Sequence, residues 1–210
     1  MTITTIVLAG GHSTRLGREK STEAIDGEPL IERVLNRVSL LSTEILVVFS
    51  QRQTQGTLSP GIRSVVDLYP GKGSLGGIYT GLKLSANFYN LVVACDMPFL
   101  NLSLLRYMID LSPAFDIIIP RVGSMIEPLH AVYSKNCLDH IEKQLEQGNL
   151  RIAAFMNAVK VRYVEEDELK NFDSEHLSFF NINKEVDLEK ARVLTAREGK
   201  QVEGATKSGR

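Results

Sequence analysis

The 210-residue sequence has little of several features that would place a protein in a specialised class. Its two cysteines, Cys95 and Cys137, lie far apart without C-x-x-C spacing, which argues against a zinc knuckle, a redox motif and a disulfide scaffold. The 24 basic and 25 acidic residues give a formal charge of -1, so no global field favours nucleic acid or a membrane surface. The apolar run near the start is far too short to span a bilayer. We therefore expect a cytoplasmic protein with no nucleic-acid or membrane partner, in which any anion site is local.

Common phosphate-binding and catalytic signatures are also missing. The sequence contains neither the G-x-x-x-x-G-K-[ST] Walker loop nor the G-x-G-x-x-G dinucleotide fingerprint. Its four histidines show no H-E-x-x-H or other metal spacing, and no G-x-S-x-G elbow offers a hydrolase serine. Any catalysis is therefore expected to depend on positioning and charge.

Apolar runs rich in β-branched residues alternate with helical patterns up to Pro120. Near-continuous apolar strands are typical of a sheet that is covered on both faces. The expected strands are Ile3–Ala9, Glu44–Phe49, Arg63–Val66, Leu91–Cys95 and Asp116–Ile119, and the expected helices are Pro29–Leu41, Leu75–Ala86 and Leu102–Leu111. This order predicts a three-layer α/β sandwich around a mostly parallel sheet.

The pattern becomes mixed after Pro120. The expected elements are a hairpin over Arg121–Glu127, an antiparallel strand at His130–Tyr133, helices at Asn136–Gln147 and Arg151–Ala158, a strand at Val161–Val164, a loop at Phe179–Asn183 and a closing helix at Glu185–Leu194. In that helix Val186, Leu188, Ala191 and Leu194 can pack inward. From Thr195 onward only one aliphatic residue is larger than alanine, so we expect one domain over residues 1–194 and a disordered polar tail over 195–210.

The first apolar strand passes directly into a glycine-rich turn, AGGHSTRLGREK. Because Gly10, Gly11 and Gly17 permit positive φ and remove Cβ atoms, the main chain there can wrap closely around phosphate oxygens. Arg15 and Lys20 add charge to the same loop. The alternative is a plain surface turn with both charges in solvent.

Asp96 follows another apolar strand, in the stretch LVVACDMPFL, and should lie at the same edge of the sheet. A carboxylate beside a triphosphate would be repelled by it unless a divalent cation lay between, and Mg²⁺ suits that bridging role. Asp96 is therefore a candidate metal ligand and catalytic residue. The alternative is that it caps a turn or the helix Leu102–Leu111.

Asp67 follows the short strand Arg63–Val66 and precedes a second glycine-rich turn. Its carboxylate could accept hydrogen bonds from the N–H groups of a base or from a ribose hydroxyl, and Gly73, Gly76 and Gly77 would let a base or ribose approach the backbone. The helix that follows offers its N-terminus to anions. The alternative for Asp67 is that of a turn-capping residue.

Asn181 and Asn183 occupy alternate positions of the segment FNIN. If this segment is extended, both amides face one way while Phe180 and Ile182 face the core. Amides supply hydrogen-bond donors and acceptors together, so this segment is a candidate site for a polar ligand. Alternatively, Asn183 caps the helix that begins near Glu185.

These segments together closely resemble the molybdenum cofactor guanylyltransferases of the MobA family. The shared residues are LAGG at 8–11 with Arg15, Gly17 and Lys20, GSLGG at 73–77, CDMP at 95–98 and NIN at 181–183. The opening signature is common to many sugar-nucleotide and cofactor nucleotidyltransferases, whereas CDMP, the stretch Gly148–Met156 and FNIN narrow the resemblance. It runs from Thr5 to about Ala191.

The resemblance implies a Rossmann-like nucleotidyltransferase fold and an enzyme that uses GTP with Mg²⁺ as cofactor. GMP would be transferred to the terminal phosphate of molybdopterin, or of its molybdenum-loaded form, with release of pyrophosphate. Cofactor-insertion proteins are the partners that direct transfer of a labile product would involve.

The resemblance also implies a role for individual residues. Those on the nucleotide side are Leu8, Ala9 and Gly10 at the nucleotide, Lys20 at its phosphates, Asp67 at the nucleoside and Asp96 at Mg²⁺. On the acceptor side, Asn181 and Asn183 would handle the pterin, and Arg151 lies where an arginine near the pterin is expected.

Three positions depart from the usual family pattern. Gly73-Ser74-Leu75 replaces Gly-Pro-Leu, Glu127-Pro128 replaces His-Pro, and Phe49-Ser50 falls where some relatives have an asparagine that contacts the nucleotide. The last two bear on how the base and the pterin are held.

Other activities would use a similar glycine loop. They include a cytidylyltransferase for the same pterin, a sugar-1-phosphate nucleotidyltransferase, and a regulatory domain that binds a nucleotide without turnover. A regulatory domain could dispense with Asp96, so its presence favours an enzyme.

Overall fold

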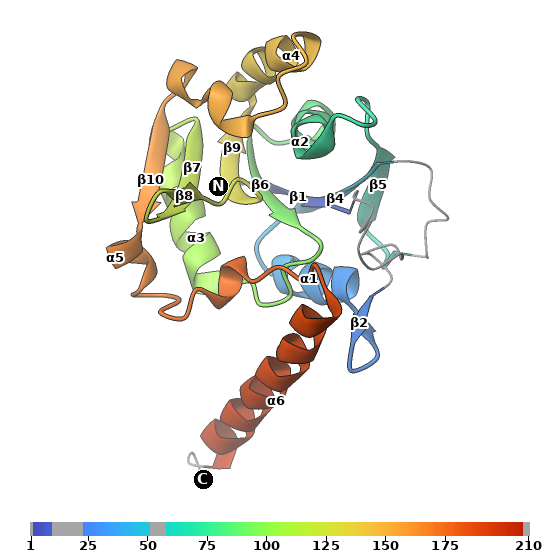
Figure 1. Cartoon of the computed structure of the whole chain (residues 1–210), viewed down its shortest axis with the longest axis vertical. Helices are drawn as coiled ribbons and strands as arrows, with labels where there is room; N and C mark the ends of the chain where they lie inside the picture. The colour runs from blue at the N-terminus through green and yellow to red at the C-terminus, as the bar shows by residue number, and fades with distance from the viewer. Residues whose placement is uncertain (1, 10–22, 51–57, 208–210) are drawn as a thin grey trace.

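The computed structural model describes residues 2–9, 23–50 and 58–207, and it confirms the expected α/β sandwich (Figure 1). The described residues form an eight-stranded sheet in the order β10-β7-β9-β6-β1-β4-β5, with β8 paired to β7, and a separate hairpin of β2 and β3. The strands are β1 (Thr4–Leu8), β2 (Ala24–Ile25), β3 (Glu28–Pro29), β4 (Glu44–Phe49), β5 (Ile62–Val66), β6 (Tyr89–Ala94), β7 (Ile117–Val122), β8 (Met125–Ile126), β9 (His130–Ser134) and β10 (Val161–Glu165).

Parallel pairing joins β6, β1, β4 and β5, and also β7 and β10. In contrast, β9 runs antiparallel to both of its neighbours, β6 and β7. The change from a parallel to a mixed sheet therefore falls where the sequence pattern changes, after Pro120.

Helices cover both faces of the sheet (Figure 1). They are α1 (Leu30–Val38), α2 (Gly73–Leu84), α3 (Leu102–Leu111), α4 (Leu138–Glu146), α5 (Glu166–Leu169) and α6 (Glu185–Lys207). One face carries α1, α3 and α5, and the other carries α2 and α4. Among the described residues, no helix is long and apolar enough to cross a membrane.

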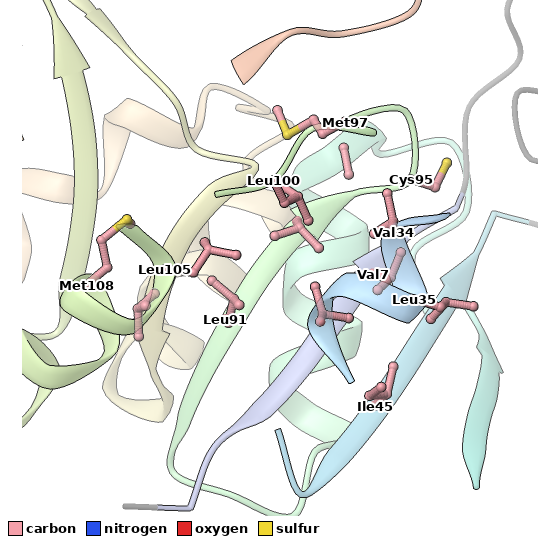
Figure 2. Close-up of a cluster of buried hydrophobic side chains, with 14 of the residues drawn as sticks. Val7, Val34, Leu35, Ile45, Leu91, Cys95, Met97, Leu100, Leu105 and Met108 are labelled. Carbon is pink, nitrogen blue, oxygen red and sulfur yellow. The ribbon is translucent and has the colours of Figure 1, made fainter. Parts of the chain in front are cut away.

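Alternation along the strands divides the core between the two faces. Val7 of β1 points toward the face of the sheet that α1 and α3 cover, whereas Ile6 and Leu8 point toward the face that α2 covers. Figure 2 shows the cluster between the sheet and helices α1 and α3, in which Leu91 of β6 lies next to Leu105 of α3. Cys95 also belongs to this cluster and is buried, as expected of a small core residue.

The helix α2 lies unusually close to β1. A Cβ built on Gly81 would come within 2.4 Å of Ile6 Cγ2, and one on Gly77 within 3.1 Å of Leu8 Cδ2. Real Cβ atoms are essentially never found under 3.0 Å from another heavy atom, so Gly81 is required for this approach.

A third cluster packs the β2–β3 hairpin and the start of α1 against the FNIN segment and the start of α6. It contains Ile25, Leu30, Phe99, Ile182, Leu188 and Ala191. The hairpin that carries Ile25 turns through Asp26 and Gly27, both with positive φ (52° and 85°). Asp-Gly between short strands is a strong hairpin signal, but this hairpin lies outside the expected elements.

The closing helix differs from its prediction in two ways. It continues past Leu194 to Lys207 and projects from the body of the molecule (Figure 1), so the disordered tail expected from residue 195 is not what the structure describes. Residues such as Ala, Arg, Glu, Lys and Gln have high helix propensity and can extend a helix that is packed at its start. Val186 was expected to pack inward but is 52% exposed.

Smaller corrections concern local geometry. The helix expected at Arg151–Ala158 is instead two short 3₁₀ turns, Ile152–Ala154 and Met156–Ala158. Pro29 ends β3 and precedes α1 rather than lying in its first turn. The one-turn helix α5 was not expected at all.

Candidate functional site

The predicted nucleotide segments meet at the carboxyl edge of the parallel strands. Ala9 follows β1 and donates its N–H to Val48 O (2.9 Å), and Asp67 follows β5 and donates its N–H to Phe49 O (2.7 Å). The chain runs from β1 to β4 and β5 on one side and returns to β6 on the other, so a switch point lies between β1 and β6. Open α/β sheets bind ligands at such points.

Four of the predicted residues belong to the glycine loop: Gly10, Gly11, Arg15 and Lys20. They lie outside the described residues. Leu8 and Ala9, which lead into the loop, are buried at the end of β1. The roles of the four loop residues remain predictions from sequence.

Asp96 lies two residues beyond the end of β6 and is 7% exposed. The helix α3 is capped by Asn101, whose Oδ1 accepts a hydrogen bond from Leu104 N–H (3.0 Å). The alternative in which Asp96 caps α3 is therefore wrong. Its carbonyl oxygen accepts a hydrogen bond from Ile182 N–H (3.0 Å), which places the FNIN segment (180–183), the predicted acceptor segment, against the Asp96 loop.

Asp67 is held by two donors on one carboxylate oxygen. Its Oδ1 accepts from the Thr80 hydroxyl (2.7 Å) and from Tyr69 N–H (3.0 Å). The second bond is the turn contact that the structural alternative predicted. The other oxygen, Oδ2, lies toward the first turn of α2, where a Cβ on Gly76 would be 3.1 Å away. Asp67 thus makes a local turn and also directs one oxygen toward the helix N-terminus.

The N-terminus of α2 lies beside this carboxylate. Gly73 begins the helix with φ 61° and is exposed, and no side chain caps the helix start. The positive end of the helix is therefore accessible to an anion or a polar base edge. Gly76 and Gly77 were expected to admit a ligand, but they are buried, and a Cβ on Gly76 would lie 2.9 Å from Tyr69 O. They serve the packing of α2.

The acceptor segment has the alternation that its sequence predicts. Ile182 is buried and Phe180 packs against the same cluster, whereas Asn181 is half-exposed and Asn183 is exposed. Asn181 Nδ2 donates to Phe179 O (2.9 Å). At the start of α6, the carboxylate of Asp187 accepts hydrogen bonds from the N–H groups of Asn183 (3.1 Å) and Lys184 (2.9 Å).

Arg151 is not brought to these asparagines. It is exposed between α4 and β10, and its N–H donates to Asn149 Oδ1 (3.2 Å). The segment that follows packs through Phe155 and Met156 on the α2–α4 face, whereas Ile182 packs with the start of α1. The contacts of the described residues do not join Arg151 to the FNIN segment.

Two buried polar residues at the site were missed by sequence reasoning. Thr80 lies within α2 and holds Asp67, and Ser178 lies below the FNIN segment within 2.7 Å of His130 Nε2. Both are fully buried, so each polar atom needs a partner. The only signal in the sequence is a lone polar residue within an apolar pattern, which does not identify its partner.

Burial also shifts the pKa values of two titratable groups at this edge. It lowers the pKa of His130 to about 4, so the imidazole is neutral at pH 7. It raises the pKa of Glu127, the residue that departs from the usual His-Pro pattern. A buried neutral histidine acts here as a hydrogen-bonding group rather than as a charge.

Comparisons with known proteins agree with this geometry. Residues 5–161 match the model of the MobA-like NTP transferase domain. A protein named "Probable molybdenum cofactor guanylyltransferase" from Pelotomaculum thermopropionicum is 39% identical over 91% of this chain and 92% of its own length. A "Molybdenum cofactor guanylyltransferase" from Desulfosudis oleivorans is 35% identical over 91% of this chain and 95% of its own.

A solved structure supports the same relationship. The crystal structure of molybdopterin-guanine dinucleotide biosynthesis protein A from Archaeoglobus fulgidus superposes with a TM-score of 0.81 and 31% sequence identity. The match covers 92% of this chain and 99% of that one, so it includes the mixed part of the sheet as well as the parallel part.

Proposed function

Because the chain belongs to the family of MobA-like NTP transferase domains, we propose that it transfers GMP from GTP to the terminal phosphate of molybdopterin or of its molybdenum-loaded form. Pyrophosphate is the second product. The activity is that named for the relatives, which align with more than nine-tenths of this chain. The chain's own residues supply a physical basis for it.

One observation carries the proposal: the hydrogen bond from Ile182 N–H to Asp96 O. This hydrogen bond joins the FNIN segment, which we propose binds the acceptor, to the loop that carries Asp96, the proposed Mg²⁺ ligand. A transferase that joins two phosphorylated substrates needs these two regions side by side, because the attacking and departing oxygens must lie in line at one phosphorus atom. A domain that only bound a nucleotide would have no need of the second segment.

The chemistry requires no side-chain base. The nucleophile is an oxygen of a phosphate monoester, which is already anionic at neutral pH. It attacks the α-phosphorus of GTP, the bond from that phosphorus to the bridging oxygen breaks, and pyrophosphate leaves. The protein has to bring two polyanions together and offset their repulsion, which is a task for charge and fixed dipoles.

The described residues divide this task. On the nucleotide side, the exposed start of α2, Gly73 and Ser74, offers backbone N–H groups, and Asp67 Oδ2 can accept hydrogen bonds from guanine N1–H and N2–H. On the acceptor side, the amides of Asn181 and Asn183 can pair with the pterin edge. Arg15 and Lys20 of the glycine loop are proposed to meet the phosphates.

The donor set fits Mg²⁺. Asp96 supplies a carboxylate at the carboxyl edge, and one or two carboxylates with substrate phosphates are the usual ligands of this ion. Within the described residues, no group of three or more His, Cys, Asp or Glu side chains could hold a metal by itself. When bound with the nucleotide, Mg²⁺ neutralises phosphate charge.

The test is pyrophosphate release by the purified protein with Mg²⁺, molybdopterin and each nucleoside triphosphate in turn. We expect release with GTP and little with CTP, ATP or UTP. Asp96→Asn should lower turnover about a hundredfold while the protein remains folded, because an amide is a poor ligand for a hard cation. The matched control is Asp110→Asn, at an exposed aspartate of α3, which should keep the parent rate. Release only with CTP, or no release with any of the four triphosphates, would refute the proposal.

A further inference from the structure

A buried polar cluster lies next to the predicted acceptor segment, at the residues that precede it in the chain. Its centre is Ser178, which is fully buried. The Ser178 hydroxyl oxygen accepts a hydrogen bond from Asn101 N–H (2.9 Å) and lies 2.7 Å from His130 Nε2, with which it shares a second hydrogen bond. The Ser178 N–H donates to Asp173 Oδ2 (2.7 Å). One serine thus joins three separate parts of the chain.

Each of these partners belongs to a part of the fold that is fixed in a different way. His130 is the first residue of β9 and is held in the sheet opposite Val93 of β6. Asn101 caps α3, and its Nδ2 also donates to Phe172 O (2.7 Å). Asp173 receives a further hydrogen bond from Leu177 N–H (3.0 Å). The cluster therefore connects the sheet and α3 to the start of the acceptor segment.

Aromatic packing closes the cluster on one side. The ring of Phe179 meets the ring of His130 edge-on, with centroids 4.9 Å apart. Phe179 directly follows Ser178. The carbonyl oxygen of Phe179 accepts a hydrogen bond from Asn181 Nδ2. The backbone of Ile182, two residues beyond Phe180, is bound to the Asp96 carbonyl. A displacement at Ser178 would therefore shift Asn181 relative to the Asp96 loop, which is held separately by the hydrogen bond from Cys95 N–H to Leu8 O (3.1 Å).

We infer that Ser178 and His130 are positioning residues that set the acceptor asparagines relative to the Asp96 loop. This inference rests on the proposed function for its catalytic meaning. Neither side chain reaches solvent, so both act through the neighbouring residues of the FNIN segment. A neutral imidazole suits this role because it can share a hydrogen bond with a hydroxyl without burying a charge. Burial, which lowers the pKa of His130, supports the neutral form.

The test compares two buried serines at opposite ends of α3. Ser178→Ala removes the hydroxyl beside the N-terminus of α3, and Ser112→Ala removes a fully buried hydroxyl that donates to Ile109 O (2.6 Å) at the other end. For each variant, kcat and KM for the acceptor would be measured together with Kd for GTP. Hydrogen exchange of residues 177–183 gives a readout that does not depend on activity.

We expect Ser178→Ala to lower kcat/KM for the acceptor about tenfold or more, because small misplacements of positioning groups are costly in rate. Its Kd for GTP should stay within about twofold of the parent, since the nucleotide segments are held by other contacts. Exchange across 177–183 should accelerate. Ser112→Ala should change neither the kinetic constants nor this exchange, even if it lowers the melting temperature.

A second pair of variants keeps the inference testable if Ser178→Ala does not fold. His130→Gln retains a polar group that can reach Ser178, whereas His130→Leu removes it. The glutamine variant should recover most of the acceptor kcat/KM that the leucine variant loses. Equal loss in both variants, or parent kinetics in Ser178→Ala, would overturn the inference.

Failure of the proposed function gives a different result. In that case the parent protein releases no pyrophosphate with GTP and molybdopterin, and kcat and KM cannot be measured for any variant. Exchange then decides: unchanged protection of 177–183 in Ser178→Ala would overturn the positioning role, and faster exchange confined to that segment would support it.

Discussion

Lowering the pH from 7 to 5 should destabilise this protein through one residue, His130. The ring is fully buried, and burial lowers its pKa to about 4 from an ordinary value of 6.5. Between these two values, the unfolded chain binds a proton that the folded chain does not. Stability therefore rises with pH in this range and is lost as the pH falls from about 6.5 toward 4.

The size of the effect follows from proton linkage. Integrating the difference in bound protons between pH 7 and pH 5 for a group with these two pKa values gives about 2 kcal/mol of lost stability. For a chain of this length, that corresponds to a fall of about 4 to 8 °C in melting temperature. Glu127 has the opposite sign, because burial raises its pKa and protonation favours the folded state.

The assay is urea unfolding at pH 7 and at pH 5 for the parent and for His130→Gln. For each protein, the free energy of unfolding at pH 5 is subtracted from that at pH 7. The difference between the two proteins isolates the contribution of His130, because the carboxylates are common to both. The variant should lose about 2 kcal/mol less than the parent over this range. Ser112→Ala, which removes a buried hydroxyl but no titratable group, should keep the parent pH dependence. Parallel pH profiles for the parent and His130→Gln would refute the reasoning.

Two further variants test the packing and orientation of α2. Gly81→Ala should cost about 1–3 kcal/mol in urea unfolding, because its Cβ would lie 2.4 Å from Ile6 Cγ2; an unchanged midpoint would contradict that close approach. Thr80→Val keeps the shape of the side chain but removes one of the two hydrogen bonds to Asp67 Oδ1 and the acceptor of Leu68 N–H, so calorimetry should show about tenfold weaker GTP binding, with recovery in Thr80→Ser. Parent affinity in the valine variant would show that this hydroxyl does not orient the nucleotide site.

Much of the fold follows from local patterns. The strand Glu44–Phe49 and the helix Leu102–Leu111 were predicted with the bounds that the structure has, because the first is a continuous apolar run and the second has apolar residues at helical spacing. The errors fall where the pattern is short or weak. Two 3₁₀ turns replace the helix at Arg151–Ala158, and the two-residue strands of the Asp26-Gly27 hairpin are too short to show any periodicity.

The site was predictable to the extent that it follows from strand ends. Asp67 and Asp96 come after apolar strands, and parallel pairing brings such positions to one edge. Thr80 and Ser178 could not be found in the same way, because their partners lie 13 and 48 residues away along the chain. Only the folded arrangement identifies them. The role of Arg151 near the pterin stays a prediction from the sequence resemblance, because its contacts in the structure are local.

The antiparallel strand β9 explains how the acceptor side of the site is supported. Its register places His130 opposite Val93, near the end of β6, while Ser134 lies opposite Tyr89 at the other end. If β9 ran parallel to β6, Ser134 would occupy the carboxyl edge and no histidine would reach Ser178. The reversal thus brings the beginning of a strand to the edge where the parallel strands end. The rigid sheet can then hold, through Ser178, a segment that has no regular structure of its own.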